Sequence, residues 1–276
     1  MSGDELHALV AGFANVAEAY DRGRPTYAPP VAEAIAEGIG AVGGLREGFR
    51  VLDLGAGTGL LSRALLVIGL DVVAVEPLQG MRQALARAIG PGRVLEGRAE
   101  AIPLGDAAVD GAVCGDAFHW FDGAAAAGEL HRVVRPGGGV AIVWLSPSLD
   151  AEEVPAWWHD VGAELEPLRR AAHHPHLYAD RRPTALEEHG GFSTPEHRRV
   201  SFVDITDRDG QLAHFASISF VGALPAGERE ALLDRLGDIL DRNGVTEVRR
   251  PHVAELWLTR RLPDPAPAEA RPAAAS

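Results

Sequence analysis

The stretch VLDLGAGTG at residues 51–59 decides the fold expected of this 276-residue chain. Its first part is a short apolar run typical of a buried strand, and its second part places glycines at positions 55, 57 and 59. Glycine permits a tight strand-to-helix turn and lets backbone N–H groups approach a ligand without interference from a Cβ atom. The stretch therefore predicts a strand, a ligand-binding loop and a helix in direct succession.

The same alternation of apolar runs and helical patterns extends from residue 31 to residue 145. Apolar runs separated by helices are typical of a parallel sheet that is buried on both faces. We therefore expect a doubly wound, Rossmann-like α/β fold. The strands are expected at residues 50–54, 71–76, 93–97, 109–115 and 140–145, with helices at 31–39, 60–68, 80–89 and 124–134 and a turn at 135–139.

The pattern changes after residue 145, where a long mixed segment suggests a cap inserted after the fifth strand. Two further strands are expected at residues 198–205 and 252–261, and two helices at residues 209–220 and 226–242. The expected division is an N-terminal lid segment (1–30), a ligand-binding core (31–145), a cap or insertion (146–197), the C-terminal part of the core (198–262) and a disordered tail (263–276).

Composition excludes several classes of function. The chain has 26 basic and 39 acidic residues, a net charge of −13, and every basic residue is arginine. Without lysine there is no Schiff-base or phosphate-loop lysine, and the acidic balance argues against a nucleic-acid partner. The single cysteine, Cys114, cannot form an intramolecular disulfide and suits a reducing cytoplasm. Because no export signal or long apolar span is found, we expect no membrane partner.

Two carboxylates distinguish the glycine loop from a dinucleotide-binding loop. Leu60 stands where the GxGxxG pattern has its last glycine, which disfavours a nicotinamide cofactor. Asp53, at the end of the first strand, suits a ligand with a cationic part. Glu76 ends the second strand, about 20 residues beyond the loop, where a carboxylate can accept hydrogen bonds from both ribose hydroxyls.

Five segments together resemble class I S-adenosylmethionine-dependent methyltransferases. They are VLDLGAGTGLLSRAL (51–65), AVEP (74–77), GRAEAIPL (97–104), CGDAFHWFD (114–122) and ELHRVVRPGGGVAIVW (129–144). The resemblance extends over residues 10–145 and is greatest to the small-molecule branch related to ubiquinone and menaquinone methyltransferases. It implies S-adenosylmethionine as cofactor and a seven-stranded sheet whose last strand is antiparallel to the rest.

The resemblance also implies where the methionine end of the cofactor lies. The loop residues Gly55, Ala56, Gly57 and Thr58 would line it, and Asp53 would lie near its amino group. Two residues of the lid segment, Tyr20 and Arg24, are either part of this site or of a surface loop. In the first case Arg24 could hold the cofactor carboxylate through a bidentate pair.

The remaining cofactor contacts implied by the resemblance involve the ribose, the adenine and the sulfonium. Glu76 would hold the ribose, while Pro77 and Met81 would pack on the adenine. The adenine amino group would meet Ala99 together with either Glu100 or the backbone. Asp116 and Ala117, just past the fourth strand, would face the reactive sulfonium.

The acceptor site is expected to include His119, because this position should open toward the transferred methyl group and histidine can take a proton at neutral pH. The alternative is a histidine packed under Trp120. The aromatic residues expected to form substrate walls are Trp120, Trp157, Trp158 and Tyr178. No metal is expected, because His173, His174 and His176 lack the spacing of a zinc site.

These observations favour a methyltransferase that acts on a small-molecule acceptor, mainly by positioning the two reactants. One alternative is an RNA or protein methyltransferase, which the acidic charge and the segment GDAFHW at residues 115–120 disfavour for bases. The other alternative is a non-catalytic, S-adenosylmethionine-binding regulatory protein. The sequence does not predict the oligomeric state.

Overall fold

The computed structural model describes residues 17–40, 48–148, 155–171 and 182–264. Within them lies one seven-stranded sheet with the order β3-β2-β1-β4-β5-β7-β6. The strands are β1 (Arg50–Leu54), β2 (Asp71–Val75), β3 (Val94–Leu95), β4 (Val109–Gly115), β5 (Val134–Pro147), β6 (Glu196–Asp207) and β7 (Glu247–Arg260).

The strand directions confirm the predicted fold class. The strands β3, β2, β1, β4 and β5 pair in parallel, and β7 runs antiparallel to both of its neighbours, β5 and β6. The seven-stranded, Rossmann-like sheet with an antiparallel last strand is therefore present. The carboxyl ends of the parallel strands meet at one edge, where ligands bind in folds of this type.

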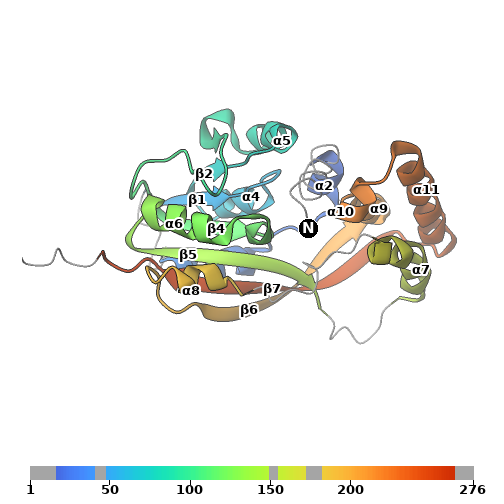
Figure 1. Ribbon diagram of the computed structural model, residues 1–276. Coiled ribbons are helices and arrows are strands. Elements are labelled where there is room, and N and C mark those ends of the chain that lie inside the picture. Colours follow the sequence, from blue (N-terminus) through green and yellow to red (C-terminus); the bar gives the residue numbers. More distant parts are fainter. Residues whose placement is uncertain (1–16, 41–47, 149–154, 172–181, 265–276) are drawn as a thin grey trace, which may run out of the picture.

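Helices cover both faces of the sheet (Figure 1). The helices α3 and α4 pack on one face through side chains such as Ile35 and Leu65, and α6 and α8 on the other through Leu130 and Leu186. The helices are α2 (Ala17–Gly23), α3 (Pro29–Ile39), α4 (Leu60–Val67), α5 (Gln79–Ile89), α6 (Gly123–Val133), α7 (Ala156–Ala171), α8 (Thr184–Glu188), α9 (Arg208–Ala216), α10 (Ser219–Gly222) and α11 (Ala226–Arg242).

A second, smaller core lies at one end of the sheet, where α7, α9, α10 and α11 gather in Figure 1. Its fully buried side chains include Phe215, Val221 and Leu236. The segment expected to form the cap divides between two places, because α7 packs in this smaller core while α8 returns to the main sheet.

Several predicted elements differ from the structure, and the strand expected at residues 252–261 is β7, Glu247–Arg260. The turn expected at residues 135–139 lies within β5, because its backbone pairs with the end of β7: Gly137 donates to the Arg261 carbonyl and Arg261 to the Gly138 carbonyl. The single helix expected at residues 209–220 is two helices, α9 and α10. The third strand, expected at residues 93–97, is only Val94–Leu95, which pairs with β2 at the edge of the sheet.

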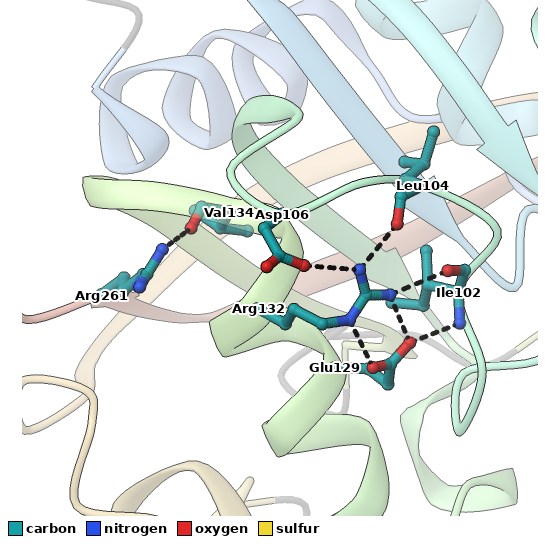
Figure 2. Close-up of polar contacts among 7 residues, drawn as sticks. All are labelled: Ile102, Leu104, Asp106, Glu129, Arg132, Val134 and Arg261. Carbon is teal, nitrogen blue, oxygen red and sulfur yellow. Dashed lines mark hydrogen bonds and ion pairs between the residues drawn. The ribbon is translucent and has the colours of Figure 1, made fainter. Parts of the chain in front are cut away.

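A partly buried arginine fixes the loop between β3 and β4 (Figure 2). Arg132 of α6 donates to the carbonyls of Leu104 and Ile102 at 2.7 and 2.9 Å, and it also pairs with Glu129. Glu129 in turn accepts a hydrogen bond from the Ile102 backbone N–H at 2.7 Å. The loop that contains Ala99 and Glu100 is therefore anchored at its far end.

Candidate active site

A cavity of about 100 Å³ lies at the carboxyl edge of the parallel strands. It brings together eight of the residues that the sequence predicted for the cofactor site, namely Tyr20, Arg24, Asp53, Gly55, Ala56, Gly57, Thr58 and Asp116. Residues not predicted for the site also line it, namely Pro25, Tyr27, Leu60, Leu61, Gly115, Leu145, His214 and His252.

The glycine loop is held by its own hydrogen bonds. The N–H groups of Gly55 and Ala56 both donate to the Val75 carbonyl, and that of Gly57 donates to Glu76 at 2.9 Å. These three donors are therefore used within the protein. Gly55 has a φ of +70°, and a Cβ there would lie 2.9 Å from the Cβ of Ala117. A Cβ on Gly57 would meet nothing within 4 Å, so the loop leaves open space at that residue.

Asp53 is a buried carboxylate at the floor of the cavity, only 1% exposed. The hydroxyl of Ser62, in the first turn of α4, donates to its Oδ2 at 2.5 Å. Burial raises the pKa of Asp53 to about 7, and the nearby Glu76 adds to the effect. A cationic group beside Asp53 would offset the cost of its burial.

Glu76 is oriented entirely by backbone groups. Its two carboxylate oxygens each accept one hydrogen bond, from the N–H of Gly57 and from that of Leu78, both at 2.9 Å. Burial raises the pKa of this carboxyl, while these hydrogen bonds and the nearby Arg82 oppose the rise. Because a carboxylate oxygen can accept two hydrogen bonds, Glu76 keeps capacity for a ligand hydroxyl.

The residues predicted near the adenine do not line the cavity. Met81 and Ala99 are buried, each 3% exposed, whereas Pro77 is exposed. Glu100 accepts a hydrogen bond from the Asp122 N–H at 3.0 Å, which places it against the start of α6. These positions remain predictions for the adenine end.

Asp116 joins the sheet to the lid segment. It adopts a φ of +50°, a conformation that non-glycine residues rarely adopt and that recurs at functional sites. Its Oδ1 accepts from the Leu145 N–H at 3.1 Å, and its Oδ2 accepts from the Tyr27 hydroxyl at 3.4 Å. Ala117, the next residue, packs against the main core and is not among the lining residues.

The opposite wall of the cavity comes from α2, α9 and β7. Gly23 of α2 lies directly against α9, where a Cβ would be 2.1 Å from the backbone nitrogen of His214. Arg24 stacks over the Tyr20 ring at 4.9 Å and donates to the Ser217 carbonyl at 3.1 Å, while its buried Nε has no hydrogen-bond partner. The close approach permitted by Gly23 thus places Arg24 and His214 on the same cavity.

A buried ion pair anchors this wall. Arg250 and Asp204, 10% and 8% exposed, form an ion pair between β7 and β6. Arg250 also donates to the Gly23 carbonyl at 3.0 Å, and Asp204 accepts from the Thr26 N–H at 3.3 Å. The pair therefore connects the lid segment to the antiparallel end of the sheet.

Two histidines complete the wall, and sequence reasoning missed both. Nδ1 of His214 is buried and has no hydrogen-bond partner. Burial lowers its pKa well below the usual value, and Arg24, Arg250 and His252 lower it further. Nδ1 of His252 lies 2.8 Å from the Arg250 carbonyl, and burial also lowers the pKa of this ring. No local motif marks either residue, since each becomes part of the site only through packing.

The predicted acceptor residues lie elsewhere. The centroid of the His119 ring lies 4.5 Å from that of Trp120 and 5.0 Å from that of Trp144. Neither His119 nor Trp120 lines the cavity. Trp157 packs in the smaller core, and Trp158 contacts the Phe215 ring at 6.2 Å. Tyr178 falls outside the described residues, as do His173, His174 and His176.

Among residues 17–40, 48–148, 155–171 and 182–264, no group of three His, Cys, Asp or Glu side chains is placed to hold a metal ion. None of the helices described in these ranges is long and apolar enough to cross a membrane.

Comparison with known proteins identifies the family. Residues 52–142 match a family model described as a methyltransferase domain. An uncharacterized methyltransferase of Mycobacterium tuberculosis is 35% identical over 228 residues, which cover 83% of this chain and 85% of the relative. A malonyl-[acyl-carrier protein] O-methyltransferase of Pectobacterium atrosepticum is 32% identical over 151 residues, which cover 54% of this chain and 58% of that protein.

A solved structure shares the fold. The structure of a candidate type II methyltransferase from Anaeromyxobacter dehalogenans superposes with a TM-score of 0.58 at 23% identity, over 87% of this chain and 99% of that one. The fold, the match to the methyltransferase domain and the mycobacterial relative agree with one another. The chain belongs to the class I S-adenosylmethionine-dependent methyltransferase family.

Proposed function

We propose that this protein transfers a methyl group from S-adenosylmethionine to a small-molecule acceptor. The observation that carries the proposal is the cavity itself, which joins the glycine loop and Asp116 to a wall built by Tyr20, Arg24, His214 and His252. The cavity lies between two walls of the protein, which suits a small acceptor rather than a folded RNA or protein surface. The net charge of −13 also opposes a nucleic-acid partner.

The polar groups of the cavity fit the methionine end of the cofactor. S-adenosylmethionine supplies a methyl group on a positively charged sulfur. Asp53 is a buried carboxylate that an ammonium group would stabilise, and Arg24 has an unpartnered Nε for a carboxylate. The hydroxyl of Thr58 is likewise buried without a partner. We assign these three side chains to the amino acid part of the cofactor.

The residues proposed for the ribose, the adenine and the sulfonium lie at or after the ends of the parallel strands. Glu76 accepts the ribose hydroxyls with the capacity left on its oriented oxygens. Pro77 and Met81, which flank the start of α5, form the adenine side together with the loop of Ala99 and Glu100. Asp116 and Ala117 are assigned to the sulfonium, an assignment supported by the place of Asp116 in the cavity lining.

The alternatives differ in what they require of the acceptor. A non-catalytic S-adenosylmethionine-binding protein needs no acceptor, and an RNA or protein methyltransferase needs a surface for a large one.

The small-molecule branch related to ubiquinone and menaquinone methyltransferases is retained as part of the proposal. A cytoplasmic location is also retained, and the single buried cysteine supports it.

The experiment is a transfer assay with S-adenosylmethionine labelled in its methyl group. The protein is incubated with three acceptor sets: small hydroxyl, amine, thiol and carboxylate compounds, then total RNA, then a protein mixture. The proposal predicts label in small-molecule products only. Label in RNA or protein, or cofactor binding without transfer to any set, would contradict it.

A further inference from the structure

The outer edge of β6 is a regular feature of the sheet that the proposed function does not use. β6 is the last strand in the sheet order and, among the described residues, pairs only with β7 (Figure 1). Its register with β7 continues over all twelve of its residues without a bulge, and it contains no proline. Proteins usually protect a sheet edge with a short strand, a bulge or a proline, because an unpaired edge can bind another strand. The edge of β6 lacks these three features and is therefore a candidate interface.

Pro251 of β7 shows which backbone groups of β6 point outward. It lies opposite Val203, and its carbonyl accepts a hydrogen bond from the Ser148 N–H on the side of β5. Because proline has no N–H, this opposed pair cannot exchange hydrogen bonds, so the N–H and carbonyl of Val203 point away from β7. Backbone direction alternates along a strand, so every second residue shares this orientation. The residues with outward backbone groups include Arg199, Ser201, Val203 and Ile205.

An exposed apolar patch lies on the same part of the strand. Val203 and Ile205 are 48% and 53% exposed, whereas Phe202, on the other face of the sheet, packs against the core beneath α3. Pro251, the neighbour of Val203 on β7, is also exposed. Burial of this patch would favour association in addition to the hydrogen bonds of the backbone.

The charges of β6 identify a second copy of this chain as the occupant of the edge. A two-fold axis normal to the sheet would place two copies of β6 side by side and antiparallel. With Val203 on the axis, Arg199 of each copy lies opposite Asp207 of the other, and Ser201 lies opposite Ile205. The two charged side chains are 59% and 66% exposed, and each is 3.8 Å from an opposite charge within its own chain. Both are therefore accessible to the second copy.

Other antiparallel registers lack this complementarity. A shift by two residues would place Arg199 opposite the apolar side chain of Ile205. The register that pairs Arg198 with a carboxylate would use Asp204, which is 8% exposed and already paired with Arg250. Opposite charges that face each other across two strands stabilise the pairing, and like charges destabilise it. The register centred on Val203 is therefore favoured.

We propose that the protein forms a homodimer in which the two β6 strands pair antiparallel with Val203 on the two-fold axis. The two sheets then form one continuous sheet. The outward backbone groups pair across the axis, the apolar patches of the two copies meet at the centre, and an Arg199–Asp207 ion pair lies at each end. This dimer is independent of the proposed function, because no residue of β6 lines the cavity.

The first test measures the dimer dissociation constant of the full chain by analytical ultracentrifugation. The wild type should dimerise at micromolar concentration. Val203→Asp places two carboxylates face to face on the axis and should weaken the dimer by about 100-fold or more. Val67→Asp is the matched control, because Val67 is 83% exposed on α4, and it should leave the constant within about twofold. A monomeric wild type, which would leave the edge to a strand of another protein, or an unchanged constant in Val203→Asp, would overturn the proposal.

The second test examines the register by exchanging charges between copies. Arg199→Glu and Asp207→Arg each place like charges opposite one another at both ends of the interface, so each variant alone should dimerise about 30-fold more weakly. In an equimolar mixture the exchanged charges are again complementary, and a heterodimer should form with a dissociation constant within about threefold of the wild-type value.

The side chain of Asp207 also caps α9 by accepting from the Gly210 N–H at 2.6 Å, so its variant should melt at a slightly lower temperature. This loss is the same in the variant alone and in the mixture, and the comparison between them reports only the charges. A mixture that dimerises no better than either variant alone, or variants that dimerise as tightly as the wild type, would refute the dimer about Val203.

Discussion

The two walls of the cavity are built in different ways. In the wall that holds the glycine loop, Asp53 pairs with Ser62 nine residues away and Gly57 with Glu76 nineteen residues away. In the opposite wall, Arg24 reaches the Ser217 carbonyl across 193 residues, and Arg250 reaches the Gly23 carbonyl across 227. The first wall is therefore a local β–α–β unit, whereas the second exists only when distant segments pack together.

The two walls are therefore expected to have different roles. The local wall presents fixed carboxylates suited to the cofactor, which is common to the whole family. The distant wall presents Arg24, His214 and His252, whose arrangement depends on α2, α9 and β7. We expect substitutions in the second wall to affect stability and acceptor recognition, and those in the first to affect the cofactor.

The largest expected effect is that of Arg250→Met, which leaves Asp204 as an unpaired charge at a buried position. Removing one partner of a buried ion pair costs about 3–5 kcal/mol, because the remaining charge stays desolvated. Urea denaturation should show this loss in the free energy of unfolding. The double variant Asp204→Asn with Arg250→Met should recover most of it, and equal losses in the single and double variants would show that the charge is not the cause.

Asp53→Asn is expected to stabilise the free protein while weakening the cofactor site. The folded-state pKa of Asp53, about 7, lies above the ordinary value of 3.8, so the folded state holds a proton that the unfolded chain releases between these values. Stability is therefore lost as pH rises from about 4 to 7, by up to about 4 kcal/mol for a shift of this size.

Thermal unfolding at two pH values tests this prediction. Asp53→Asn should melt at a higher temperature than the wild type at pH 8 and at a similar temperature at pH 4. A variant that is less stable at pH 8 would contradict the assignment of Asp53 as a strained, buried carboxylate. Such a gain in stability at the cost of binding is common at functional sites.

Glu76→Ala should weaken S-adenosylhomocysteine binding by about 1.5–3 kcal/mol, the range for hydrogen bonds to a charged group. The matched control is Glu96→Ala, which removes a 75% exposed carboxylate that pairs with Arg82. Calorimetry should show a weaker Kd for the first variant and an unchanged one for the second. Equal affinities for both would remove Glu76 from the site.

The smallest expected effect is that of Tyr27→Phe. It deletes the hydroxyl that donates to Oδ2 of Asp116 at 3.4 Å and so links the lid segment to the sheet. Because the hydrogen bond is long, the free energy of unfolding should fall by only about 1 kcal/mol. A loss as large as that of Arg250→Met would mean that the lid is anchored here rather than at Asp204.

The contrast between the walls also explains what the sequence could predict. Asp53, the glycine loop and Glu76 lie within 24 residues and carry a recognisable motif, so the sheet and the cofactor side followed from local pattern. His214 and His252 lie on a helix and a strand that carry no motif, and only packing brings them to the cavity. Trp157 and Trp158 were predicted as substrate walls because of their aromatic character. Trp157 packs in the separate core of α7 and α9–α11, and Trp158, which is 40% exposed, lies against the Phe215 ring.

The boundaries of the helices and strands could likewise be predicted only where the sequence pattern is local. The strand at residues 50–54 and the helix at residues 226–242 match β1 and α11, because apolar pattern and flanking residues define them locally. The glycines at 137–139 suggested a turn, but pairing with the end of β7 makes them part of β5. Such pairing cannot be inferred from a segment alone.

The most direct test of the central claim, that this cavity is an S-adenosylmethionine site, is calorimetric titration of S-adenosylhomocysteine into the full chain at pH 6 in two buffers. We expect a micromolar Kd, which corresponds to a binding free energy of about −7 to −8 kcal/mol. Binding should release a proton, because the ligand ammonium lowers the pKa of Asp53. NAD should give no heat. Absence of S-adenosylhomocysteine binding, together with tight NAD binding, would contradict the account.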